Sequence, residues 1–98
     1  MVKHIILWTL KEEANNDEVK AGIKEGLESL LGVIPGLLEI KVQTEKFESS
    51  TADVMLYSVF ESEKALKEYS VHPAHVEVAN TKVRPFTQTR SCIDFEEK

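Results

Sequence analysis

Residues Val2 to Lys11, VKHIILWTLK, form the stretch that decides the fold. The segment is rich in β-branched and aromatic residues and ends in charges, so it predicts a β-strand from Val2 to about Lys11. Alternation along this strand places His4, Ile6 and Trp8 on one face and Ile5, Leu7 and Thr9 on the other. Both faces are mostly apolar, whereas a sheet with one solvated face alternates apolar and polar residues.

The chain after this strand predicts a helix that opens at a capping box. Asn15 is the predicted cap and Glu18 stands three residues further on. The apolar residues that follow at helical spacing are Val19, Ile23, Leu27, Leu30 and Leu31. Gly22 and Gly26 lie within this helix and would allow close approach to the sheet. Ile34-Pro35-Gly36 then ends it, because proline restricts the residue before it and glycine accepts positive φ.

The rest of the sequence repeats the pattern of strand, helix and strand. The segments are strands at Leu37 to about Glu45 and Asp53 to Phe60, a helix capped by Ser62 with Ala65, Leu66 and Tyr69, a short helix at about 74–83 after Pro73, and a strand from Gln88 to about Glu96. The order βαββαβ predicts a single α+β domain over residues 1–98. This is the ferredoxin-like arrangement, with two helices on one face of a four-stranded antiparallel sheet.

Two helices cannot cover both faces of such a sheet. The third strand also carries apolar residues on both faces, with Leu56 on one and Met55 and Tyr57 on the other. The uncovered face must therefore pack on another protein or enclose a ligand, because large exposed apolar patches are rare on monomers. We expect a homodimer whose two sheets close into an α/β barrel with an apolar pocket.

Composition narrows the classes of partner. The formal net charge of -5 disfavours nucleic acid and anionic membrane surfaces as partners. Cys92 is the one cysteine, which excludes an intrachain disulfide and a thiolate zinc cluster, and we expect it to be a half-buried strand residue. The first apolar run is too short to span a bilayer and lacks a cleavage site, so a cytoplasmic protein is expected.

The three histidines are the main candidates for a catalytic or binding role in this sequence. Tyr69 precedes His72-Pro73-Ala74-His75, and Pro73 turns the chain at this corner. One interpretation is an acid/base pair, in which an imidazole accepts a proton and the phenol polarises a carbonyl. The alternative is structural, with His72 capping a helix and Tyr69 filling the core.

His4 allows two further interpretations. It shares a strand face with Trp8 and is either a satisfied buried histidine or a polar group inside an apolar ligand pocket. The predicted binding residues of such a pocket are His4, Trp8 and His72. A metal site formed by His4, His72 and His75 is a weaker alternative, because no cysteine ligand or HExxH pattern supports it, and we predict no metal. Arg84 and Arg90 are expected to be surface or interface charges. No phosphate-binding loop, nucleotide fingerprint or flavin fingerprint is present, and no cofactor is expected.

Several segments together resemble the stress-responsive A/B barrel domain (Dabb) family. They are the start Val2 to Trp8, the turn 34–36, Phe60-Glu61-Ser62, the segment from Tyr69 to Val76, and the ending from Arg90 to Phe95 with Asp94. The resemblance covers nearly the whole chain, and the HPAH segment after a tyrosine is its most specific part. It implies a ferredoxin-like subunit and a homodimer closed into a barrel.

The resemblance also implies two candidate functions. One is a stress-associated or small-molecule-binding protein without catalysis. The alternative is a polyketide-cyclase-like enzyme without a cofactor, acting on an apolar or carbonyl-rich molecule, with Tyr69 and His75 as acid and base and His4 lining the pocket. The cyclase branch has another histidine early in the third strand, but this chain has none between Asp53 and Leu56. A monooxygenase, with or without heme, rests on fold analogy alone.

Overall fold

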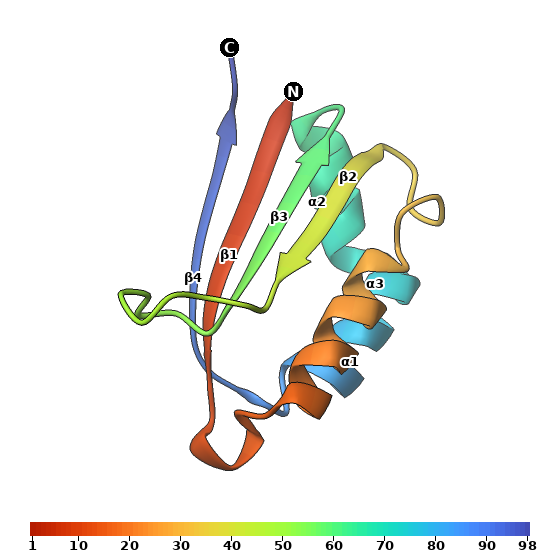
Figure 1. The fold of residues 1–98 in the computed structure, drawn as a ribbon. Helices are drawn as coiled ribbons and strands as arrows, with labels where there is room; N and C mark the ends of the chain where they lie inside the picture. Colours follow the sequence, from red (N-terminus) through yellow and green to blue (C-terminus); the bar gives the residue numbers. More distant parts are fainter.

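The computed structural model describes residues 1–98 as nine consecutive elements (Figure 1). They are β1 (Val2–Leu10), the 3-10 turn η1 (Glu12–Ala14), α1 (Asp17–Glu28), β2 (Leu37–Gln43), β3 (Val54–Phe60), α2 (Glu63–Val71), α3 (Pro73–Val78), the π-helical turn η2 (Ala79–Val83) and β4 (Thr87–Glu96). The predicted βαββαβ order is confirmed. No helix combines the length and hydrophobicity that crossing a bilayer requires.

The four strands form one antiparallel sheet in the order β2-β3-β1-β4. The helices all lie on one face of this sheet, and β2 and β4 are its two edge strands (Figure 1). Because β1 is central, its side chains pair with both neighbours: Ile6 stands opposite Leu56 of β3 and Cys92 of β4. The face of β1 predicted to carry His4, Ile6 and Trp8 is the one packed under the helices, and all three residues are buried.

The helix ends differ from the sequence prediction at α1. Asn16 caps the helix, not Asn15, because its side chain accepts the hydrogen bond from the Val19 amide at 2.9 Å. Asn15 instead ends the preceding 3-10 turn. The helix also stops at Glu28, so Leu30 is buried as expected but Leu31 is half exposed, not part of the apolar stripe.

The glycines of α1 make close contacts, but with a helical segment and not with the sheet. A methyl group added at Gly26 would lie 2.9 Å from Cγ1 of Val78, and one at Gly22 would lie 3.9 Å from the Lys82 side chain. Because Gly22 and Gly26 have no side chains, α1 can approach α3 and η2 closely. Those two elements carry part of the cavity described below.

The sheet face opposite the helices carries a continuous apolar surface. Ile5 stands between Tyr57 of β3 and Ile93 of β4, and Leu7 stands beside Met55. Leu7 and Ile93 are 43% and 59% exposed, and no other element of the chain covers this face (Figure 1). An uncovered patch of this kind is typical of a protein–protein interface.

Gly36 is predicted to be essential for the connection into β2. Both Gly32 and Gly36 have positive φ, which costs a residue with a side chain roughly 1–2 kcal/mol. A methyl at Gly36 would also lie 2.5 Å from Cβ of Ala65, whereas nothing lies within 4 Å at Gly32. We expect Gly36→Ala to lower the free energy of unfolding by about 1–3 kcal/mol more than Gly32→Ala does. Urea unfolding measures both, and equal losses would contradict the packing argument.

The uncovered sheet face predicts self-association. A charge at the centre of this face should break a homodimer, because a buried unpaired carboxylate is strongly unfavourable. Sedimentation velocity should show a dimer for the natural sequence at micromolar concentration and a folded monomer for Ile93→Asp. Val71→Asp is the matched control, since Val71 is exposed on α2, on the other side of the sheet. A monomeric natural protein would refute the prediction.

Candidate functional site

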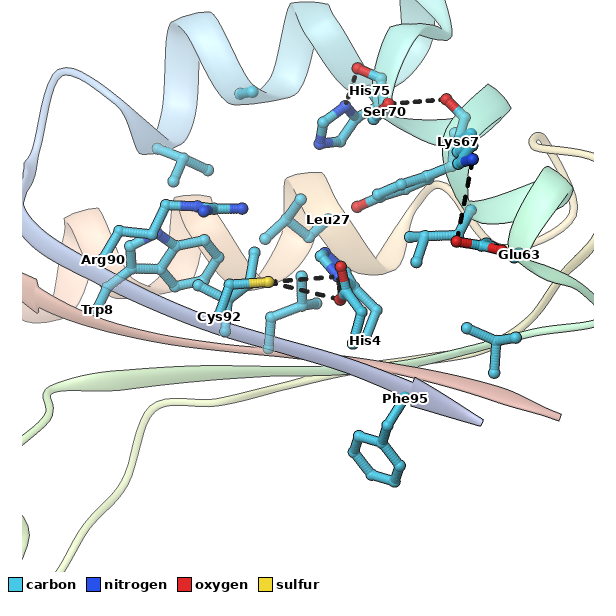
Figure 2. Close-up of a pocket in the computed structure, with 18 of the residues that line it drawn as sticks. His4, Trp8, Leu27, Glu63, Lys67, Ser70, His75, Arg90, Cys92 and Phe95 are labelled. Atoms are coloured by element: carbon cyan, nitrogen blue, oxygen red, sulfur yellow. Dashed lines mark hydrogen bonds and ion pairs between the residues drawn. The ribbon is translucent and has the colours of Figure 1, made fainter. Parts of the chain in front are cut away.

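A cavity of about 680 Å³ lies between the sheet and the second half of the helical layer (Figure 2). Its walls come from β1, β4, α2, α3 and η2, and the volume falls in the range of small-molecule sites. The cavity therefore lies under the helices, on the inner face of the sheet. The sequence left open which face of the sheet lines a pocket, and the cavity lies on the face of His4, Ile6 and Trp8.

Tyr69 contributes a buried hydroxyl to the wall of this cavity. Its side chain is 1% exposed, and its ring packs against Phe60 at a centroid distance of 4.9 Å. The hydroxyl has no hydrogen-bond partner, although buried polar atoms almost always have one. Burial raises the pKa of the phenol well above its ordinary value, so the group stays protonated near neutral pH and can donate.

His75 lies directly against Tyr69, with ring centroids 4.2 Å apart and planes inclined by 38°. Its Nδ1 is 3.3 Å from the carbonyl oxygen of Ser70, which can only accept, so Nδ1 carries the proton when the ring is neutral. Nε2 is then the free base, and Figure 2 shows the other edge of the ring turned toward the cavity. Burial, aided by the positive charge of Arg84, lowers the pKa of the imidazole.

His4 is a buried histidine with a carboxylate partner. It is 7% exposed, and its Nδ1 hydrogen-bonds with Oδ1 of Asp94 on the adjacent strand β4. Its ring is also close to Tyr69, at a centroid distance of 6.0 Å. Both interpretations made from the sequence therefore apply together: the histidine is satisfied by a partner, and it lines the cavity.

Of the other two predicted binding residues, Trp8 lines the cavity and His72 does not. Trp8 is 4% exposed and forms part of the cavity wall. His72 does not line the cavity, because it links two helices: it is the C-cap of α2 and the N-cap of α3. Its Nδ1 accepts from the Ala74 amide at 3.1 Å. The capping alternative thus describes His72, while Tyr69 is at once a core residue and a cavity residue.

Sequence reasoning did not assign several polar residues to the cavity, among them four that lie on β4 or just after η2. Arg90, Cys92 and Asp94 alternate along the inner face of β4, and Arg84 follows η2. Alternation along the strand could have placed Arg90, Cys92 and Asp94 on one face from the sequence alone. The register, in which Cys92 pairs with Ile6, shows that this is the inner face. Cys92 itself is more exposed than expected. Burial, together with the charge of Asp94, raises the pKa of its thiol, so it is a poor nucleophile.

One group of side chains has the composition of a metal site. His4 Nδ1, Cys92 Sγ and an Asp94 oxygen lie within 4.8 Å of one another, and these are ligand types that zinc accepts. The hydrogen bond between His4 and Asp94 already engages two of the three, so an ion would have to replace it. The grouping of three histidines considered from the sequence is not formed.

The sequence of this chain matches a known protein family. The family model described as "Stress responsive A/B Barrel Domain" (Dabb) matches residues 2–97. The chain therefore belongs to the Dabb family, as the resemblance in its sequence predicted. No curated protein matches the sequence at a significant level.

Solved structures with the same fold include proteins described as dimeric and proteins named as enzymes. A dimeric ferredoxin-like protein of unknown function from Bacteroides fragilis is 30% identical, with a TM-score of 0.88 over 98% of this chain and 95% of that one. An Arabidopsis thaliana protein is 26% identical, with a TM-score of 0.85 over 100% and 96%. A hydroxynitrile lyase from Passiflora edulis is 17% identical, with a TM-score of 0.81 over 96% and 90%, and shares the fold.

The unpartnered hydroxyl of Tyr69 gives a prediction about stability. A buried hydroxyl without a partner costs about 1–3 kcal/mol, so Tyr69→Phe should be as stable as the natural protein or more stable by about 1 kcal/mol. Tyr57→Phe is the matched control, because the Tyr57 hydroxyl accepts a bond from Lys3 Nζ at 2.7 Å and its removal should bring no gain. Thermal and urea unfolding measure both. A clear loss of stability in Tyr69→Phe would mean that the hydroxyl has a structural partner.

Proposed function

We propose that this protein binds an apolar carbonyl compound in the cavity and moves a proton at the carbon next to the carbonyl. The observation that carries the proposal is the Tyr69 hydroxyl, a buried donor without a partner beside the free nitrogen of His75. A ligand carbonyl oxygen would satisfy this hydroxyl. The mostly apolar wall, including Trp8, suits the remainder of such a molecule.

His75 is the base in this proposal. A neutral imidazole with Nδ1–H held by the Ser70 carbonyl presents Nε2 to the ligand, and its lowered pKa keeps it unprotonated at neutral pH. Nε2 takes the proton from the α-carbon, and the electron pair of that C–H bond moves into the carbonyl to give an enolate. This step requires an acid and a base and no electron carrier.

Tyr69 stabilises the negative charge that appears on the oxygen. Its raised pKa keeps the proton on the phenol, so the group acts as a hydrogen-bond donor to the enolate rather than as a second base. The enolate carbon then regains a proton from His75, or attacks a second carbonyl carbon of the same molecule. In the second case a C–C bond forms and the imidazolium protonates the new alkoxide, which completes an aldol closure.

His4 and Asp94 hold the wall next to Tyr69. The carboxylate fixes the orientation of the imidazole, and the ring packs 6.0 Å from Tyr69. We assign this pair a positioning role, since it limits where the phenol ring can lie and lends a polar group to the cavity.

Binding without turnover is the second candidate, and one observation favours it. The Tyr69 and His75 rings are stacked, so their contact alone would hold the corner between α2 and α3 together without any reaction. The same cavity would then store or carry its ligand. Exchange of α-protons distinguishes the two candidates, because a mere binder does not accelerate it.

We expect the natural protein to accelerate exchange of the α-protons of 4-phenylbutan-2-one in D₂O, followed by NMR. His75→Ala should reduce the protein-dependent rate by about 10²-fold or more, and Tyr69→Phe should also reduce it. The rate should fall as the pH drops through the pKa of His75, which lies below the ordinary value of 6.5, because protonation removes the base. Above that pKa the rate should level off.

His72→Asn is the control for this experiment, because it keeps a helix cap and lies outside the cavity. Its exchange rate should match that of the natural protein. If the ketone binds, as shown by chemical shifts of the cavity residues, but exchange is not accelerated, the enzymatic proposal fails and binding alone remains.

A further inference from the structure

The acidic side chains around the cavity have positively charged or hydrogen-bonding partners, whereas its two arginines have no carboxylate partner. Glu63 is 3.9 Å from the Lys67 ammonium, Asp94 bonds to His4, and Glu96 accepts from the N-terminal ammonium at 2.6 Å. Arg84 and Arg90 complete the charged lining, and neither has a carboxylate within 4.0 Å. In a chain with a net charge of -5, two arginines without an acidic partner at one cavity are notable.

Both arginines lie at the end of the cavity that holds the base. Arg90 stands opposite Trp8 in the β1–β4 register, and Figure 2 shows its guanidinium extending from β4 into the space below His75. Arg84 follows η2 and is held by Asn80, whose Oδ1 accepts from Nη1 at 2.5 Å. The positive charges of both groups act on the His75 ring, so all three residues share one part of the site.

The guanidinium groups retain donors for a ligand. Each arginine has five N–H donors, of which Arg84 uses one for Asn80. Paired N–H groups fit the two oxygens of a carboxylate, which lysine cannot do in the same way. The opposite strand supplies the flat apolar surface of Trp8, against which the body of a ligand can lie.

We propose that Arg84 and Arg90 form a carboxylate subsite, so that the ligand of this cavity is an apolar carbonyl compound bearing a carboxylate. This inference rests on the proposed function and names its class of substrate. The arginines hold the acid group, while Tyr69 and His75 face the carbonyl and its α-carbon. A bound carboxylate also offsets the positive charge that opposes protonation of His75 during the reaction.

The subsite can be tested with two probes of nearly the same shape, one anionic and one neutral. We expect the natural protein to bind 4-butylbenzoate about tenfold more tightly than 4-butylbenzamide, measured by calorimetry or NMR titration. Arg84→Gln and Arg90→Gln should each weaken benzoate binding by about tenfold and leave benzamide binding within about twofold. Benzoate binding should also weaken as salt is added. In the natural protein, saturating benzoate should raise the pKa of His75 in an NMR titration, and benzamide should not.

Lys82→Gln is the control for the loss of one positive charge, since Lys82 is on η2 but outside the cavity lining. It should leave both affinities unchanged. Equal affinity of the two probes, or an equal loss of both in the arginine variants, would overturn the subsite. Ketone exchange is measured separately: if it fails while the benzoate preference holds, the catalytic proposal falls and the subsite stands.

Discussion

The central position of β1 is the constraint on which the rest of the structure depends. This strand pairs with both β3 and β4, so its two apolar faces must be buried by different means. The inner face carries His4, Ile6 and Trp8 under the helical layer. The outer face, around Ile5 and Leu7, is covered by no helix or strand of the chain, although the loop between β2 and β3 borders it beside Leu7 and Met55 (Figure 1). One strand thereby separates the cavity from the exposed apolar surface, and a substitution on one face need not disturb the other.

The inner face also explains why polar groups persist in an apolar wall. A protein selected only for stability would pair or remove the Tyr69 hydroxyl, because an unsatisfied buried donor is costly. The His4 imidazole, by contrast, is matched by Asp94, and the Ser58 hydroxyl donates to the His4 carbonyl at 3.0 Å. The one buried side-chain donor without a partner thus lies at the cavity. Local violations of this kind are expected where a protein meets its ligand.

The sequence predicted the fold well because its signals were local and periodic. Alternation in β1, the Ser62 cap and Pro73 each act over a few residues, and each appears where predicted. The site was harder, because its members are far apart in the chain. Asp94 meets His4 across 90 residues, and only the β1–β4 register brings them together. Arg90 is exposed, as expected from the sequence, but a sequence does not show that its strand borders a cavity.

The edge strand β4 is what makes the cavity possible. The helices pack over the other strands (Figure 1). The side chains of β4 are therefore largely exposed, and those on its inner face border the cavity. Polar residues such as Arg90 and Asp94 are tolerated there because they remain exposed. Under α1 the same residues would be buried, which is unfavourable for a charged group. The apolar side of the cavity is supplied by β1, and the proposed acid and base come from the corner at Pro73. These three parts of the chain, β4, β1 and the corner at Pro73, each contribute a different chemical property. No single segment of the sequence therefore reveals the whole site.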